Sequence, residues 1–343
     1  MTGLAARPHK KKSQRLPAPG QVCFGLFAVF CLLLLLRNAD IAMEYIHQGL
    51  LLCARMVIPA LFPFMILSEI LLGGGLIHWI PQRLLHPLEK LLDLPRAGCC
   101  AVILGMLCGA PVGARCACLS YDRGELTREE AQRVLPCANH PSSAFLINAV
   151  GVSLWESRRF GWALYTLVLL SALLLCLLGN RYRKRKTPRT AQGSESMDSP
   201  RGLQGAKLFT ESIASATRSI LTVCAYVIFF SALMGALTVV LHSVSLPAPL
   251  YTLLFCLLEI SGGVGQAAGL DSPFLGGVIT AFACGWSGLS MHCQVLSICD
   301  GRGFSFRPYL LTKLAQGLLC AALFGLVLLL FPELSLAADP VGF

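Results

Sequence analysis

The feature that most constrains this chain is a series of nine apolar segments, most of them long enough to cross a lipid bilayer. A helix needs about 20 residues to cross roughly 30 Å of hydrocarbon. Hydrophobic residues make up 55% of the 343 residues and charged residues only 13%, whereas soluble domains carry about 25% charged residues. The sequence therefore predicts an all-α polytopic membrane protein. The nine segments are 22–37, 56–80, 98–119, 136–155, 160–179, 219–241, 250–270, 273–298 and 308–331.

Two basic stretches predict the orientation of the chain. Residues 1–21 form a basic tail, and the run 181–189 opens a linker over 180–207 that is rich in Ser, Gly and Pro. Basic residues next to apolar segments are typical of cytoplasmic flanks, so the net charge of +10 does not predict a nucleic-acid partner. We expect both stretches to be cytoplasmic and the linker to be disordered. Segment 22–37 lacks a small-residue cleavage site, so we expect an extra transmembrane helix there.

The number of crossings predicts a re-entrant hairpin in the first half. If 98–119, 136–155 and 160–179 all crossed, the basic linker would lie outside, against the positive-inside rule. Segment 98–119 is the best candidate for turning back, because glycine and proline interrupt it at 109–113.

The second half repeats this pattern in the opposite orientation. Segment 250–270 contains a glycine-rich break at 261–265 and is predicted to turn back there. Each half then consists of a helix, a re-entrant hairpin and two further helices, which is an inverted-topology repeat. We assign the first repeat to 41–179, the second to 208–331 and a short tail to 332–343.

The interrupted segments predict the functional site. In hydrocarbon every backbone N–H and C=O needs a partner, so broken segments must line a cavity or lie inside the protein. Breaks at corresponding positions of two repeats are typical of a transporter's binding site, and helix N-termini at such breaks favour anions. The predicted pathway residues are Gly109, Ala110, Pro111, Val112, Gly113, Arg115, Asn139, His140, Ser142, Ser143, Glu259, Ser261, Gly262, Gly263, Ser287, Ser290 and Gln294.

These residues also have structural interpretations. Arg115 either pairs with a substrate carboxylate or only sets the topology at the cytoplasmic edge. Glu259 either carries a coupling proton or caps backbone amides of its hairpin. The polar residues of 139–143 either face a cavity or begin a helix at the interface. Those of 273–298 either line a pathway or join neighbouring helices.

Several motifs carry a family resemblance. They are residues 59–64 with Ser68 and Glu69, residues 109–115, residues 126–131 leading to Asn139, and residues 285–294. From about residue 40 to 331 the chain resembles the sporulation integral membrane protein YlbJ family, part of the nucleoside-recognition or Gate-domain group that includes concentrative nucleoside transporters. The resemblance implies a transporter used in endospore formation, in the outer forespore membrane that derives from the mother cell. The implied substrate is dipicolinic acid.

The sequence disfavours an enzyme, a metal protein and a nucleotide-driven pump. Residues 285–288 match the Gly-x-Ser-Gly of rhomboid proteases, but no histidine follows His292 to act as the base. The 16 cysteines lie mostly in apolar segments without C-x2-C spacing, so we expect no disulfide framework, metal or cofactor. A phosphate-binding loop of the G-x-x-x-x-G-K-[ST] type is lacking.

Two alternatives to dipicolinate transport stay open. One is a nucleoside-type secondary transporter, and the other is a sporulation scaffold that recruits partners through its linker. The lipid bilayer is the expected environment. The coupling ion, a proton or sodium, and the oligomeric state are left undecided by the sequence.

Overall fold

The computed structural model describes residues 19–75, 80–184, 205–242, 244 and 246–334. Within these ranges the secondary structure is helical, which confirms the prediction of an all-α polytopic membrane protein. The predicted tail at 1–21, the linker at 180–207 and the tail at 332–343 fall largely outside the described residues. The α-helices are α1 Pro19–Arg37, α2 Ala39–Leu52, α3 Ile58–Gly73, α4 Gln82–Leu92, α5 Arg96–Cys108, α6 Ala110–Asp122, α7 Arg128–Ala138, α8 Arg158–Lys184, α9 Gly205–His242, α10 Ala248–Leu258, α11 Ile260–Ala268, α12 Pro273–Trp286, α13 Gly288–Cys299 and α14 Phe306–Leu330. Two π-helical segments, Cys53–Val57 and Phe145–Leu154, and a 3-10 turn at Pro332–Leu334 complete them.

Four stretches of the described chain are long and apolar enough to cross a bilayer as helices, and the number rises to six if each of two sharply bent pairs counts as one span. The four are 158–179, 205–241, 273–299 and 306–330. The bent pairs join α1 to α2 and α4 to α5, each with a bend of 99°. Many large apolar side chains on these helices are exposed, among them Leu326 and Leu329. Such an apolar surface suits lipid rather than water.

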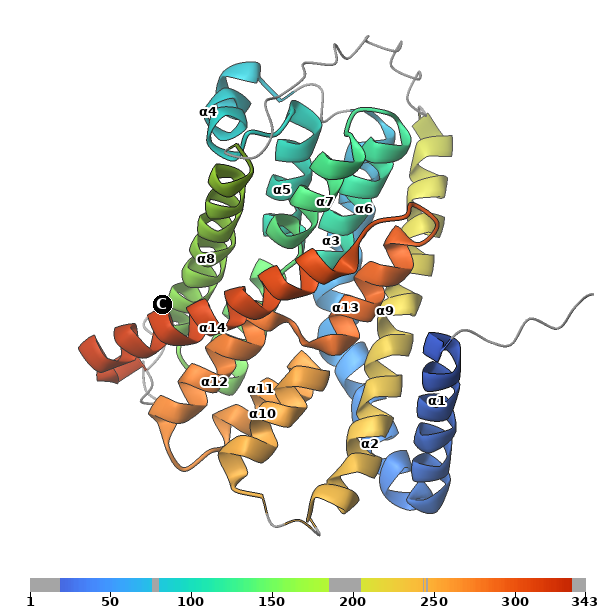
Figure 1. Cartoon of the computed structure of the whole chain (residues 1–343), viewed down its shortest axis with the longest axis vertical. Helices are drawn as coiled ribbons and strands as arrows, with labels where there is room; N and C mark the ends of the chain where they lie inside the picture. The colour runs from blue at the N-terminus through green and yellow to red at the C-terminus, as the bar shows by residue number, and fades with distance from the viewer. Residues whose placement is uncertain (1–18, 76–79, 185–204, 243, 245, 335–343) are drawn as a thin grey trace, which may run out of the picture.

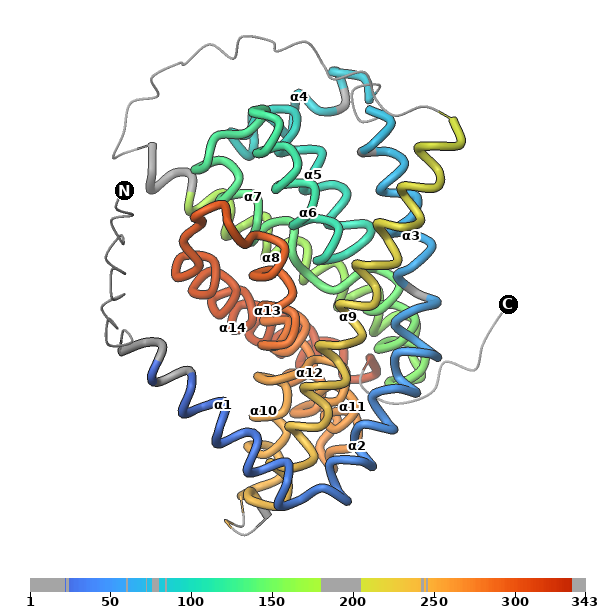
Figure 2. Tube along the Cα trace, turned by 90° about the vertical axis from the view of Figure 1, so that its right-hand side faces the viewer, coloured from blue at the N-terminus to red at the C-terminus, as the bar shows by residue number. Residues whose placement is uncertain are grey.

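Two long helices run side by side through the molecule. The first is continuous from α2 through the π-helical segment Cys53–Val57 into α3, and the second is α9 (Figures 1 and 2). Residues 41–55 and 208–218, which precede the predicted crossings 56–80 and 219–241, are helical and continue directly into them. A helix longer than the hydrocarbon thickness is accommodated by tilting or by extending beyond the membrane.

The predicted hairpins appear as two pairs of short helices that enter from opposite ends of the molecule. The pair α5 and α6 runs from the end where α9 begins to mid-height and back, while α10 and α11 do the same from the end where α9 finishes (Figure 1). Gly109 breaks the first pair and Glu259 breaks the second. The two tips therefore face each other near the middle of the molecule.

Two segments predicted as single crossings are also interrupted. Segment 136–155 ends its α7 helix at Ala138 and resumes helical structure only around Ala144, because Pro141 lacks an N–H for a helical hydrogen bond. Segment 273–298 breaks between α12 and α13, where Ser287 adopts a left-handed conformation with φ of 79° and Gly288 follows with φ of 76°. Each half of the chain thus contributes one hairpin and one broken helix.

The helices α8 and α14 close the bundle around these interrupted elements. Two main clusters of buried apolar residues lie on either side of the mid-height level: one centres on α5, α6 and α7, and the other on α10 to α12 with α8 and α14. The breaks lie between the two clusters, where close packing is incomplete.

Candidate functional site

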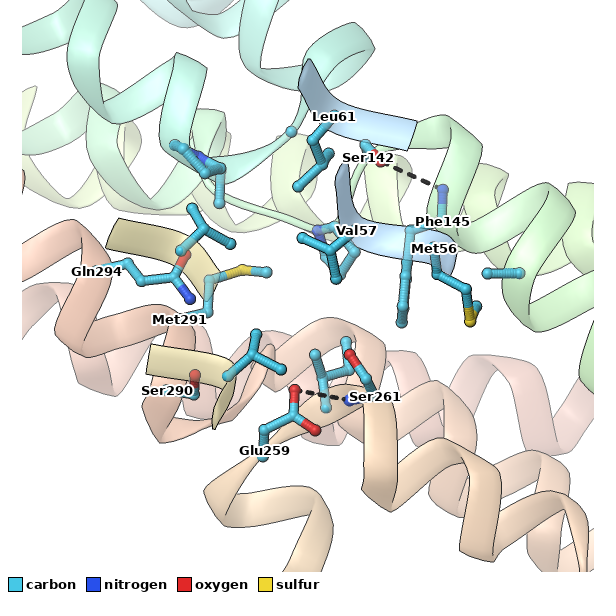
Figure 3. A pocket seen from close by; sticks show the side chains of 18 residues that line it. Met56, Val57, Leu61, Ser142, Phe145, Glu259, Ser261, Ser290, Met291 and Gln294 are labelled. Atoms are coloured by element: carbon cyan, nitrogen blue, oxygen red, sulfur yellow. Dashed lines mark hydrogen bonds between the residues drawn. The ribbon is translucent and has the colours of Figure 1, made fainter. Parts of the chain in front are cut away.

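The four breaks meet around one cavity of about 70 Å³ in the middle of the molecule (Figure 3). We call it the central cavity. Its wall combines apolar side chains from Cys53–Val57, α3 and α9 with backbone and polar side chains from the two hairpin tips and both broken helices. The lining residues are Met56, Val57, Leu61, Gly109, Ala110, Pro111, Pro141, Ser142, Phe145, Ala149, Val223, Val227, Glu259, Ile260, Ser261, Ser290, Met291 and Gln294.

In the first half, the hairpin tip packs directly against the broken helix. Gly109 has φ of 95° and ψ of −179°, a conformation that is essentially restricted to glycine. A side chain at this position would meet the backbone nitrogen of Ser142 at 3.1 Å. The hydroxyl of Ser142 in turn accepts a hydrogen bond from the amide of Phe145 at 3.2 Å and caps the next helical segment. Glycine at 109 is therefore required both for the turn and for this contact.

The second half shows the same relationship. A Cβ atom on Gly288 would lie 3.0 Å from the nitrogen of Ile260, so the break between α12 and α13 packs against the tip of α10 and α11. The carboxylate of buried Glu259 accepts hydrogen bonds from the amides of Ser261 at 3.0 Å and Gly262 at 2.7 Å. Glu259 thus caps α11, and its side chain occupies the anion position at this helix N-terminus.

Eight of the predicted pathway residues line the central cavity. Glu259, Ser261, Ser290 and Gln294 come from the second half (Figure 3). Ser290 is buried and its Oγ has no hydrogen-bond partner within the described chain. The four from the first half are Gly109, Ala110, Pro111 and Ser142.

The other predicted residues lie behind this wall. Val112 and Gly113 belong to the first turn of α6, and Gly262 and Gly263 to that of α11. Gly113 packs so closely against the carbonyl of Ala138 that a Cβ atom would collide with it.

The polar residues around the two broken helices mostly point away from the cavity. Ser143 donates to the carbonyl of Leu107 at 3.1 Å, and Ser287 to that of Cys284 at 3.4 Å. His140 is buried, with Nε2 3.1 Å from the carbonyl of Cys137. The Asn139 side chain is also buried, and neither its nitrogen nor its oxygen has a partner within the described chain.

Arg115 is engaged by the protein's own residues. Its Nε lies 2.5 Å from the carboxylate of Glu69 on α3, and its guanidinium donates to Ser219 at 2.6 Å and to Ser215, both on α9. These contacts tie the first hairpin to the two long helices. In this conformation Arg115 connects the first hairpin to α3 and α9 and does not line the central cavity.

A second cavity of about 210 Å³ adjoins the central one, and we call it the outer cavity. It shares Pro111, Val223 and Gln294 with the central cavity and extends between the first half of α9 and the second half of α13. Arg218 gives its wall a cation, and Ser219, Thr222 and Ser297 give it hydroxyl groups. The outer cavity therefore lies between the central cavity and the end of the molecule where α9 begins.

Further contacts hold the two halves together at that same end. Arg302, in the loop between α13 and α14, binds Asp122 at the end of α6, with Nη2 2.6 Å from Oδ2. Hydrogen bonding to Asp122 raises the pKa of the Arg302 guanidinium. The Sγ atoms of Cys118 on α6 and Cys299 on α13 lie 3.6 Å apart.

Sequence reasoning missed one ionisable residue inside the bundle. Lys313 on α14 is fully buried, and its Nζ donates to the carbonyl of Asn139 at 2.7 Å and to Oε1 of Gln316 at 2.7 Å. A lysine in the apolar segment 308–331 was the available indication, because charged residues within membrane segments are rare and usually functional.

Comparison with known proteins finds a membrane protein that is similar in sequence. The chain is 26% identical over 327 residues to the sporulation integral membrane protein YlbJ of Bacillus subtilis (strain 168), covering 86% of this chain and 79% of that protein. This similarity confirms the family suggested by the sequence motifs and agrees with the apolar helices in indicating an integral membrane protein. No family profile matches the chain, and no solved structure matches it either.

Proposed function

We propose that this YlbJ homologue is a secondary transporter of a small organic anion, dipicolinic acid, during endospore formation. The observation that carries the proposal is the meeting of two oppositely directed hairpin tips, at Gly109 and Glu259, around one cavity. Irregular backbone within a membrane protein is tolerated where it lines a cavity, and paired breaks of this kind are typical of transporter binding sites.

The chemistry of the central cavity suits a flat, aromatic dicarboxylate. The N-terminus of α6 lies at the cavity wall, and helix N-termini stabilise carboxylates through the helix dipole, whereas the N-terminus of α11 is already capped by the Glu259 carboxylate. Ser142, Ser290 and Gln294 offer hydrogen bonds, while Met56 and Phe145 offer apolar contact for a ring. At about 70 Å³ the cavity is much smaller than typical ligand pockets of about 300 Å³ or more. Substrate entry therefore requires the hairpins to separate.

The orientation and location follow from the basic stretches and from the relative. We place the N-terminal tail and the linker in the cytoplasm, as the positive-inside rule favours. The outer cavity then opens toward the cytoplasm, with Arg218 at its wall to attract anions. The name of the B. subtilis relative supports a role in sporulation, and we place the protein in the outer forespore membrane.

Uptake of labelled dipicolinate and labelled uridine by cells expressing the chain tests the proposal. We expect dipicolinate accumulation above an empty-vector control, and its loss in Glu259→Gln, which exchanges one acceptor of the α11 amides for an NH2 donor, and in Gly262→Leu. Gly265→Ala is the matched control, because nothing lies within 4 Å of a Cβ atom at that position. Uridine accumulation alone would support the nucleoside alternative. No movement of dipicolinate would refute the preferred substrate.

Deletion of residues 187–205 tests the scaffold alternative. A transporter whose pathway lies between the hairpins keeps its uptake without the linker, as long as the chain still inserts. Loss of sporulation with intact membrane insertion and intact uptake would favour recruitment through the linker.

A further inference from the structure

We propose that Lys313 is a proton-binding site that couples transport to the proton gradient. The inference rests on the proposed transport function and adds the coupling ion to it. Protonation forms one N–H bond at Nζ, and release to the other side of the membrane breaks it, so no other reactant is needed.

The surroundings of Lys313 lack a compensating negative charge. No carboxylate of the described chain forms an ion pair with Nζ, which is fully buried. A buried ammonium without a paired charge is costly, and such groups tend to give up their proton. The titratable groups that face it from α7, α13, α14 and the segment after α7 are Cys137, His140, His292, Tyr309 and Cys320. None of these groups ordinarily supplies a negative charge at neutral pH.

The hydrogen bonds of Lys313 suit a group that gains and loses a proton. Nζ has two acceptors, the carbonyl of Asn139 and Oε1 of Gln316, both at 2.7 Å. A neutral amine has two N–H donors and an ammonium has three. Both donors of the neutral form are thus satisfied, while the protonated form is favoured by the C-terminal end of α7, whose carbonyl dipoles attract a cation. Both protonation states are therefore supported by the same site.

A proton fits this position better than a substrate anion does. Lys313 lines neither the central nor the outer cavity, so a dicarboxylate has no access to it in this conformation. Three buried groups near Lys313 or the cavity have no hydrogen-bond partner in the described chain, namely the side chain of Asn139, Nε2 of His292 and Oγ of Ser290. Ser290 lines the cavity. Imidazole groups such as that of His292 can take part in proton relays within membranes.

Lys313 is also linked mechanically to the cavity. Its Nζ donates to the carbonyl of Asn139. Two and three residues further along the chain, Pro141 and Ser142 line the central cavity. Gln316, its other partner, donates to the carbonyl of Val168 on α8 at 3.0 Å. A change in the charge of Lys313 changes the strength of its hydrogen bond to the carbonyl of Asn139. That carbonyl belongs to the broken helix that packs against the hairpin tip at Gly109.

The test uses the purified full chain in liposomes that contain a pH-sensitive dye, with labelled dipicolinate and with the membrane potential clamped at zero. If one proton moves with each substrate, a gradient of about two pH units sustains up to about a hundredfold accumulation. We expect wild type to accumulate substrate and to move protons with it. Lys313→Met, which cannot bind a proton, should only equilibrate the substrate, without proton movement. Lys207→Met on exposed Lys207 is the control and should behave as wild type.

A second variant protects the test against misfolding. Gln316→Glu places a carboxylate against Nζ, which should hold the proton at Lys313 and also abolish accumulation, with folding checked by gel filtration in detergent. Accumulation that persists in a folded Lys313→Met or Gln316→Glu variant would overturn the inference, and so would wild-type transport that ignores the proton gradient. If wild type moved no dipicolinate at all, the proposed function would fail instead.

Discussion

Arg302 and Asp122 form a two-point ion pair, with Nε 2.9 Å from Oδ1 and Nη2 2.6 Å from Oδ2. The pair connects the end of the first hairpin, α6, to the loop between α13 and α14. It lies at the end of the molecule where α9 begins, beyond the outer cavity. The two halves of the inverted repeat are therefore joined outside the cavities as well as around them.

We predict that this ion pair contributes a measurable but small stabilisation. Asp122→Asn and Arg302→Gln should each lower the unfolding temperature in detergent, and the double variant should lose less than the sum of the two. Because both side chains are partly exposed, we expect a coupling energy of about 0.5 to 1 kcal/mol. Strictly additive effects would mean that the two residues do not interact in solution.

Gly109 should tolerate no side chain. Gly109→Ala forces a side chain into a backbone conformation that costs about 1 to 3 kcal/mol, and it brings a methyl group against the backbone of Ser142. We expect a lower unfolding temperature and loss of uptake. The matched variant Gly265→Ala, in the second hairpin, has open space for its methyl group and should change neither. Equal behaviour of the two variants would contradict the role assigned to the tip.

Oxidation should lock the two halves through Cys118 and Cys299. Their Sγ atoms lie 3.6 Å apart, and a disulfide needs about 2.05 Å, so only a small side-chain movement is required. If transport requires α6 and α13 to move relative to each other, oxidative cross-linking should stop uptake and a reducing agent should restore it. Cys118→Ser should be insensitive to the oxidant. Full uptake by a cross-linked protein, verified by mass spectrometry, would exclude movement between these helices.

Cysteine accessibility tests the topology. Arg123 follows α6 and Arg158 begins α8, and the proposed orientation places them on opposite sides of the membrane. An impermeant thiol reagent added outside should label Arg158→Cys and spare Arg123→Cys in intact cells. The labelling of wild type, which comes from the native cysteines, is subtracted as background. Labelling of both residues from the same side would refute the re-entrant hairpin and with it the pairing of the two halves.

The sequence predicted that some helical segments are interrupted, but it did not predict how many. Glycine and proline at 109–113 predicted the first break, which lies at Gly109. The second turn was predicted at 261–265, but these residues belong to α11 and the chain breaks at Glu259 instead. The break at Ser287 was not predicted, since a serine in a left-handed conformation has no sequence pattern of its own. The structure shows this break in the positive φ angles of Ser287 and Gly288 and in the close packing of Gly288 against Ile260.

The roles of individual polar residues depended on distant partners. Arg115 was predicted to face a substrate or the cytoplasm, but Glu69 and two serines of α9 engage it. Asn139 was predicted to line the pathway, but it offers its carbonyl to Lys313, 174 residues away in the sequence. Neither contact follows from local spacing.

The sequence by itself determined that the chain forms apolar helices and where several of them break, because a bilayer requires every backbone polar group to be bonded within the protein. Only the tertiary structure decided which breaks meet, which polar groups face the cavity and which ionisable residue is buried with no ion-pair partner among the described residues. The physical reason is that helix formation depends on neighbours along the chain, whereas burial and pairing depend on residues that only folding brings together.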